Sequence, residues 1–348
     1  MLSFHLMKEY YEALCRKDPN YDGTFYVGVK TTGVFCRSIC PARKPKLKNC
    51  EFFEQAKEAL LAGFRPCKRC QPLSHPNEVP ENVRKLLQAV EKEPEKRWKE
   101  EDFRKLSLTA SRASRLFKKR FGMTFVAYAR ACRMGIALKQ IKEQKLVIDT
   151  QIHLGYDSGS GFRDAFSKIM GVPPAKSGEV KLLQADWIDT PLGPMIAIGD
   201  EKELYLLEFV DRRGLEREIE RLRKKLNAAI VPGKSNSIES IRVELHDYFA
   251  GNLTQFLTSV NLLGSPFQLK VWSELKKIPF GKTCSYRDLA TILGNPHAVR
   301  AVGSANGANQ IAIVIPCHRV INTDGQLAGY GGGLPRKRWL LEHESNHL

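Results

Sequence analysis

A cysteine followed directly by a histidine stands near the end of the chain, at Cys317 and His318. A thiol is a strong nucleophile only as a thiolate, and a neighbouring base is the usual means of forming one. The apolar run 311–315 ends at Pro316 and predicts a buried strand, which would place the thiol at the end of a rigid element. The pair is therefore a candidate nucleophile and base, although a small buried cysteine beside a surface histidine fits the same residues.

A second group of thiols lies nearer the start of the chain, where Cys36 and Cys40 are followed, after 26 residues, by Cys67 and Cys70. Two closely spaced pairs with an intervening segment fit a tetrahedral zinc site of four thiolates. Zinc would keep the thiolates ionised and would stabilise a small module that has little core of its own. A purely structural zinc site is the simpler interpretation of this spacing.

Composition narrows the class of protein. A chain of 348 residues predicts two or three domains, and a formal charge of +17 favours a polyanionic partner, nucleic acid first and an anionic membrane surface second. The sequence has no signal-peptide pattern and no apolar run that approaches the length of a membrane span, so we expect a cytoplasmic protein. Nine cysteines in that compartment indicate metal ligands and nucleophiles rather than disulfides.

Breaks in the pattern divide the chain into three parts, which end near Glu78, near Gly178 and at the C-terminus. Strands are expected in the third part at 186–189, 195–198 and 204–210, followed by a helix at 213–226. After Pro266 the pattern becomes helical up to the Cys-His pair.

The middle part is helical and basic, with 14 Lys/Arg and 4 Asp/Glu in residues 97–145. Two helix-turn-helix units are expected at 102–121 and 147–170, joined by a long helix at 125–144. Thr109 and Ser158 are the expected N-caps of their second helices. A basic helical surface without sequence specificity is the alternative for either unit alone. Phe162 and Phe166, at i and i+4, indicate core rather than base contacts.

Three resemblances to known families follow from these segments. Residues 33–40 and 62–72 resemble the N-terminal module of the Ada family, bacterial proteins that repair alkylated DNA and activate transcription. The paired helical units resemble AraC-type DNA-binding domains. Residues 265–286, 299–303 and 315–319, the last reading Ile-Pro-Cys-His-Arg, resemble the O6-alkylguanine-DNA alkyltransferases, and this resemblance covers about residues 186–344.

The alkyltransferase resemblance implies a role for each matched residue. Cys317 would accept the alkyl group and keep it as a thioether, His318 would act as base through water, and Glu344 would orient the histidine. Asn309 would position the nearby backbone. Two further roles are implied for Tyr286, which would hydrogen-bond the guanine, and for Arg300, which would fill the gap left by the rotated nucleotide. Taken alone, Tyr286 could be a core residue and Arg300 a phosphate contact.

The Ada resemblance implies that Cys36 has a second role. It would be a zinc ligand with Cys40, Cys67 and Cys70, and it would also accept a methyl group from a methyl phosphotriester of the DNA backbone. Loss of one thiolate charge would weaken the repulsion of DNA phosphates, so methylation would act as a switch.

The expected architecture is a multidomain α+β protein. Its parts would be a zinc-binding α/β module at 1–78, an all-α double helix-turn-helix domain at 79–178, a small sheet subdomain at 183–262 and a helical, winged-helix-like catalytic subdomain at 263–348. We expect one Zn²⁺ ion and double-stranded DNA as partner, with RNA polymerase during activation. We also expect a monomer, with no membrane contact, in the bacterial cytoplasm beside the nucleoid.

The function expected from the resemblance is irreversible transfer of methyl groups from O6-methylguanine and O4-methylthymine to Cys317, and from methyl phosphotriesters to Cys36. The second transfer would convert the protein into a transcription activator of the response to alkylation. One alternative is a zinc-containing DNA-binding regulator with weak or no alkyl transfer. Another is a repair enzyme whose basic middle supplies only non-specific DNA affinity.

Overall fold

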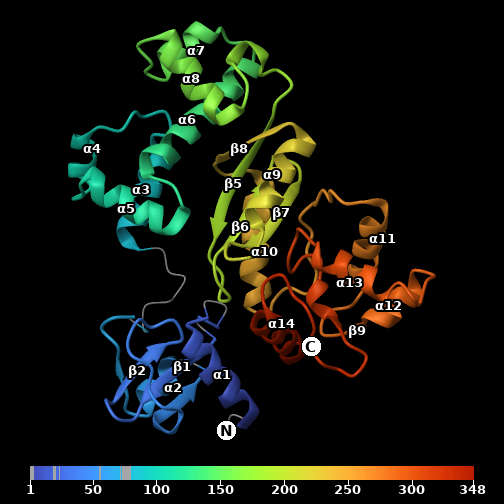
Figure 1. Ribbon diagram of the computed structural model, residues 1–348. Coiled ribbons are helices and arrows are strands. Elements are labelled where there is room, and N and C mark those ends of the chain that lie inside the picture. Colours follow the sequence, from blue (N-terminus) through green and yellow to red (C-terminus); the bar gives the residue numbers. More distant parts are fainter. Residues whose placement is uncertain (1–3, 19–20, 23, 55, 71, 73–79) are drawn as a thin grey trace.

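The structure is a computed structural model that describes residues 4–18, 21–22, 24–54, 56–70, 72 and 80–348, and its parts are shown in Figure 1. The expected boundary between Glu78 and Val79 lies outside the described residues. Among the described residues no helix is long and apolar enough to cross a membrane.

The N-terminal module is a small sheet with a helix packed on it. Its strand order is β3 (Cys50–Phe53), β1 (Tyr26–Val29), β2 (Val34–Arg37) and β4 (Arg65–Pro66), in which only β4 runs parallel to its neighbour β2. The module also contains α1 (Phe4–Arg16), η2 (Leu47–Asn49) and α2 (Ala56–Leu61). Tyr10 of α1 stacks on Phe25 at 4.3 Å between ring centroids, in the same core as three of the cysteines. The zinc-site thiols are thus held between a helix and a sheet.

The middle part is all helical, as expected. Its elements are α3 (Glu81–Lys92), α4 (Glu100–Lys105), α5 (Ala110–Phe121), α6 (Phe125–Lys142), α7 (Val147–His153), α8 (Gly159–Met170) and η3 (Pro174–Lys176). Both predicted caps are confirmed: the Thr109 hydroxyl accepts from the Arg112 amide and the Ser158 hydroxyl accepts from the Gly161 amide. Phe162 and Phe166 are buried. The second helix of each unit, α5 and α8, therefore begins where its capping residue places it.

The C-terminal part begins with a four-stranded sheet of order β7 (Leu204–Phe209), β6 (Met195–Gly199), β5 (Lys181–Ile188) and β8 (Ala228–Pro232). Strand β5 starts before the expected residue 186, and α9 (Leu215–Leu226) starts after the expected residue 213. The remaining elements are α10 (Asn236–Phe249), α11 (Pro266–Leu275), β9 (Cys284–Ser285), α12 (Tyr286–Ile292), α13 (Val299–Gly307), η4 (Cys317–Arg319), β10 (Val320–Ile321) and α14 (Leu334–Asn346).

The strand predicted at 311–315 is wrong. Ile311 makes a single bridge to Leu207 of β7, and the chain then turns at Ile313, whose φ is +72°. The run is buried, as an apolar run should be, but its length cannot distinguish a strand from a buried turn. Cys317 consequently follows a tight turn and opens the 3-10 helix η4.

The helix-turn-helix part and the alkyltransferase-like sheet share a core. Ala229 and Val231 of the edge strand β8 pack into the same cluster as Phe162 and Phe166 of α8. The contact is close, because a Cβ on Gly135 of α6 would lie 2.8 Å from the Val231 side chain. Strand β8 thus completes the core of the second helical unit (Figure 1).

We predict that Gly135→Val lowers the free energy of unfolding by about 1–3 kcal/mol, because the added side chain overpacks the contact with Val231. Urea unfolding followed by far-ultraviolet circular dichroism measures the change. Gly178→Ala is the matched control, since a Cβ there meets nothing within 4 Å, and it should stay within about 0.5 kcal/mol. An unchanged midpoint for Gly135→Val would contradict the close contact.

Candidate active site and metal centre

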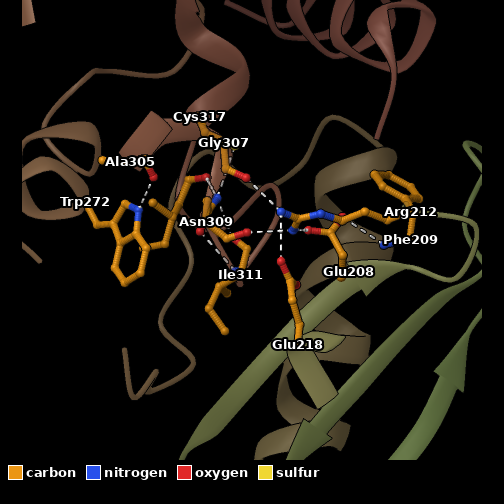
Figure 2. Close-up of polar contacts among 11 residues, drawn as sticks. Glu208, Phe209, Arg212, Glu218, Trp272, Ala305, Gly307, Asn309, Ile311 and Cys317 are labelled. Atoms are coloured by element: carbon orange, nitrogen blue, oxygen red, sulfur yellow. Dashed lines mark hydrogen bonds and ion pairs between the residues drawn. The ribbon is translucent and has the colours of Figure 1, made fainter. Parts of the chain in front are cut away.

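Asn309 organises the turn that presents Cys317. Its side-chain amide donates to the Ile315 carbonyl at 2.9 Å and to the Cys317 sulfur at 3.1 Å, while its side-chain oxygen accepts from the Ile311 amide at 3.0 Å. One buried side chain therefore closes the turn on itself and places a donor on the thiol (Figure 2). Competition of this kind between a side chain and the backbone ladder explains why an apolar run forms no strand here.

The thiol of Cys317 is buried and protonated at neutral pH. Burial raises the pKa of Cys317 to about 11, although the Asn309 hydrogen bond acts in the opposite direction. A nucleophile in this state needs a base that removes its proton during the reaction.

His318 is a buried base with one nitrogen already occupied. Its Nε2 lies 2.8 Å from Oε1 of Glu344, so this nitrogen carries the proton and donates it to the carboxylate. Nδ1 is buried and has no hydrogen-bond partner among the described residues, so it is the nitrogen that remains to receive a proton. The idea of a surface histidine is excluded. Burial lowers the pKa of His318, against the hydrogen bond and charge of Glu344, and favours the neutral ring.

Glu344 of α14 is the centre of a larger network than the sequence predicts. Besides His318, its carboxylate accepts from Arg319 at 2.8 and 3.0 Å, from the Tyr248 hydroxyl at 2.8 Å and from the Gly281 amide at 3.1 Å. Burial acts to raise the pKa of Glu344, but the hydrogen bonds and charges of His318 and Arg319 outweigh it and hold the pKa well below its usual range. The carboxylate is therefore ionised and fixed on the histidine.

Residues missed at the sequence level complete this network. Arg319 lies inside the Ile-Pro-Cys-His-Arg segment, so the motif itself pointed to it. Tyr248 and Gly281 carry no local signal, because they are 96 and 63 residues from Glu344 and only the fold brings them together.

Tyr286 and Tyr330 are the two tyrosines near Cys317. Tyr286 is the first residue of α12 and is half-buried, and its hydroxyl donates a weak hydrogen bond to the Ala328 carbonyl at 3.4 Å. Lys337 of α14 donates to the same carbonyl at 2.5 Å, and burial lowers the pKa of Lys337 to about 8. The Tyr330 hydroxyl is buried with no hydrogen-bond partner among the described residues.

Arg300 stands apart from the buried residues. It lies on α13 and is exposed, whereas Cys317, His318 and Asn309 are buried. An exposed position is compatible with DNA contact.

The four predicted zinc ligands form one cluster. Cys36 lies on β2, Cys67 directly follows β4, and the sulfur atoms of the four cysteines all lie within 4.8 Å of one another. The Cys40 and Cys67 sulfurs are 4.0 Å apart, close to the spacing of about 3.8 Å that tetrahedral Zn–S bonds of about 2.3 Å require. The Arg37 amide lies 3.4 Å from the Cys70 sulfur, which adds an N–H donor outside the ligand set.

A hydrogen bond from Cys36 lowers the pKa of Cys70 to about 5, and the same contact raises the pKa of Cys36. A groove of about 640 Å³ opens beside this cluster. Its lining includes Cys36, Cys40, Cys67, Arg43, Lys44, Arg65, Lys68 and Arg69.

Three family models match the chain. The metal binding domain of Ada matches residues 9–72, a helix-turn-helix domain matches 103–177, and the 6-O-methylguanine DNA methyltransferase DNA binding domain matches 266–346. The bifunctional transcriptional activator/DNA repair enzyme Ada of Escherichia coli K12 is 33% identical over 349 residues, which cover 97% of this chain and 96% of that protein. The chain belongs to the Ada family.

Other Ada-family and alkyltransferase proteins give consistent matches. The regulatory protein ada of Salmonella typhimurium is 32% identical over 94% of each chain. A crystal structure of Mycobacterium tuberculosis OGT in complex with DNA is 40% identical, covers 48% of this chain and 94% of that chain, and has a TM-score of 0.41. The predicted α+β organisation and the single four-cysteine zinc site are confirmed, while the roles assigned to individual residues stay predictions.

We predict that the free energy of unfolding falls as the pH drops below about 6.5, with His318 as one source. Burial lowers the pKa of His318 in the folded protein, so on acidification the unfolded chain takes up the histidine proton first. The stability that His318 contributes above the pKa of the unfolded chain is therefore lost as the pH falls below that value. Replacement by asparagine, His318→Asn, should reduce the slope by up to about 1.4 kcal/mol per pH unit between about pH 6.5 and 5.

Urea unfolding at several pH values tests this slope. The matched control is His297→Asn, since His297 is exposed, and it should retain the wild-type slope. Glu344 contributes in a separate window below about pH 4.5, because its folded pKa is depressed. Equal slopes for wild type and His318→Asn would show that the histidine is not buried as a neutral ring.

Proposed function

We propose that this Ada-family protein repairs alkylated DNA by irreversible methyl transfer to two of its own cysteines and activates transcription once one of them is methylated. The observation that carries the proposal is the arrangement at Cys317, a buried thiol with the Asn309 donor on its sulfur and, next in the chain, a base fixed by Glu344. A regulator that had lost alkyl transfer would have no need of this arrangement. The family membership supports the same conclusion.

The transfer at Cys317 is a displacement at carbon. The thiol proton passes to Nδ1 of His318 through water, the sulfur attacks the methyl carbon of O6-methylguanine or O4-methylthymine, and the carbon–oxygen bond breaks. The electron pair of that bond stays on the base, which leaves neutral after taking up a proton from water, and we assign the hydrogen bond that stabilises this departure to Tyr286. The new thioether has no leaving route, so each molecule reacts once.

The substrate base has to leave the duplex before it can reach a buried thiol. We assign Arg300 to the gap that the rotated nucleotide leaves, because it is exposed on α13. Gly303 and Ser304 on the same helix are small and would let the backbone approach the minor groove. The formal charge of +17 supports the contact with the DNA backbone.

The second acceptor is Cys36 of the zinc centre. Zinc bound by Cys36, Cys40, Cys67 and Cys70 would keep Cys36 as a thiolate without a histidine base. The basic groove beside the cluster fits a methylated backbone phosphate. Methylation changes the formal charge of the zinc centre from −2 to −1, which lowers its repulsion of DNA phosphates.

We extend the proposal to partners and location. The units of α4–α5 and α7–α8 would read promoter DNA, each placing its second helix in a major groove. RNA polymerase would be the partner during activation. The protein would act as a monomer in the bacterial cytoplasm, associated with the nucleoid. The domains would be 1–78, 79–178, 183–262 and 263–348, although β8 joins the second and third in one core.

We predict that duplex DNA containing O6-methylguanine adds one methyl group to the peptide that carries Cys317, and that methyl-phosphotriester DNA methylates Cys36 in a Cys317→Ala variant. Peptide mass mapping measures both. Unmethylated duplex is the control for each. If neither O6-methylguanine nor the phosphotriester methylates the protein, the chain is a regulator only, and methyl found on another zinc ligand would refute the assignment to Cys36.

We predict that methylation of Cys36 raises the affinity for promoter DNA by on the order of tenfold, because one negative charge near the phosphates is removed. Electrophoretic mobility shifts before and after exposure to methyl-phosphotriester DNA measure the change. The affinity should also fall steeply with salt. An unchanged promoter affinity would assign the zinc module to repair alone.

A further inference from the structure

Arg212 connects the sheet to the segment that carries the reactive cysteine. It stands three residues after the end of β7, and its side chain is 7% exposed. The guanidinium donates to the Asn309 carbonyl at 2.7 Å and to the Gly307 carbonyl at 2.8 Å (Figure 2). A residue far from the active-site motif thus bonds to the backbone on both sides of residue 308.

Two carboxylates hold this guanidinium in place. Glu208 is 2% exposed and pairs with Nη1 of Arg212, and Glu218 of α9 lies 3.1 Å from Nη2. Carboxylates from β7 and α9 therefore hold the guanidinium in the orientation in which it donates to the two carbonyls. Removal of Arg212 would leave two backbone carbonyls without this donor and a buried carboxylate without its main cation.

The hydrogen bond from Arg212 to Asn309 affects the position of the Cys317 thiol, because Asn309 contacts both residues. Its backbone carbonyl is held by Arg212, and its side-chain amide donates to the Cys317 sulfur. Arg212 also lies against the glycine-rich segment 331–333, since a Cβ on Gly331 would be 3.0 Å from the Arg212 Nε. The Arg212 side chain therefore contacts both the turn that precedes Cys317 in the chain and the glycine-rich segment that follows it.

The pair also sets the charge that faces the thiol. Arg212 lowers and Glu208 raises the pKa of Cys317, after the larger effects of burial and of Asn309. The other ionisable groups facing the sulfur are Lys337 of α14, Tyr286 of α12, Tyr330 and the adjacent His318. Burial raises the pKa of Glu208 to about 7, so Glu208 carries its charge over the alkaline range in which Cys317 ionises.

We infer that Arg212 and Glu208 are positioning residues for alkyl transfer: Arg212 holds the Asn309 turn against Cys317, and Glu208 anchors Arg212 while opposing its charge. The inference rests on the transfer proposed at Cys317. It differs from a purely structural role for the pair, because charge changes at the two residues act on the ionisation of the thiol in opposite directions.

The test compares single-turnover methyl transfer from O6-methylguanine duplex to the full-length protein across pH. For Arg212→Met we expect a rate constant at neutral pH reduced by on the order of tenfold or more, with the midpoint of the pH profile moved to higher pH. For Glu208→Gln we expect the midpoint to move to lower pH, because the amide keeps a hydrogen-bond acceptor but loses the opposing charge. Arg212→Lys should recover the midpoint but only part of the rate, since lysine keeps the charge and loses the two-pronged geometry.

Arg213→Met is the matched control, because it removes the same charge from the neighbouring, exposed position. It should leave the rate and the midpoint at the wild-type values. DNA affinity of the Arg212 variants should stay within about twofold of wild type, since the side chain is buried. If Arg212→Met does not fold, Arg212→Lys and Glu208→Gln carry the test.

The inference would be overturned if the pH midpoints of both Glu208→Gln and Arg212→Met equalled that of the wild type. Where Arg212→Met does not fold, a wild-type midpoint in Glu208→Gln alone would overturn it. A wild-type protein that accepts no methyl group would instead refute the proposed function, so the two failures are distinguishable.

Discussion

A carboxylate that is fully removed from water must find all its hydrogen-bond partners in the protein. Glu344 does so with five hydrogen bonds, which come from three side chains and one backbone amide. These partners come from α10, from the residues before β9 and from η4, so the single charge ties three segments to α14. The same contacts decide which nitrogen of His318 is protonated. The same contacts therefore set both the orientation of the His318 ring and the packing of the C-terminal part.

Much of this arrangement could be predicted from local sequence. A few neighbouring residues were enough to predict the caps at Thr109 and Ser158 and the four-cysteine cluster. The same holds for the Cys-His-Arg segment. The turn at Ile313 could not be predicted, because an apolar run gives no sign that Asn309 will close it. The contacts of Tyr248 with Glu344 and of Arg212 with Asn309 could not be predicted either, since they join residues 96 and 97 positions apart.

The division into domains is less sharp in space than along the chain. Val231 of the alkyltransferase sheet fills the core of the second helical unit, and Arg120 of α5 forms an ion pair with Asp189 just after β5. The Phe121 and Trp187 rings meet edge to face at 4.8 Å beside that pair. These apolar contacts fix the direction of α5 and α8 against the sheet, so the helix-turn-helix units and the alkyltransferase sheet form one scaffold.

We propose that the two acceptor thiols are activated by different means, Cys36 by zinc and Cys317 by His318 with Glu344. The most direct measurement is methyl uptake at each cysteine after the zinc has been removed with a chelator. We expect uptake from methyl-phosphotriester DNA at Cys36 to be lost, whereas uptake from O6-methylguanine DNA at Cys317 should be retained. Retention of Cys36 methylation without zinc, or loss of Cys317 methylation in a protein whose C-terminal part is still folded, would contradict it.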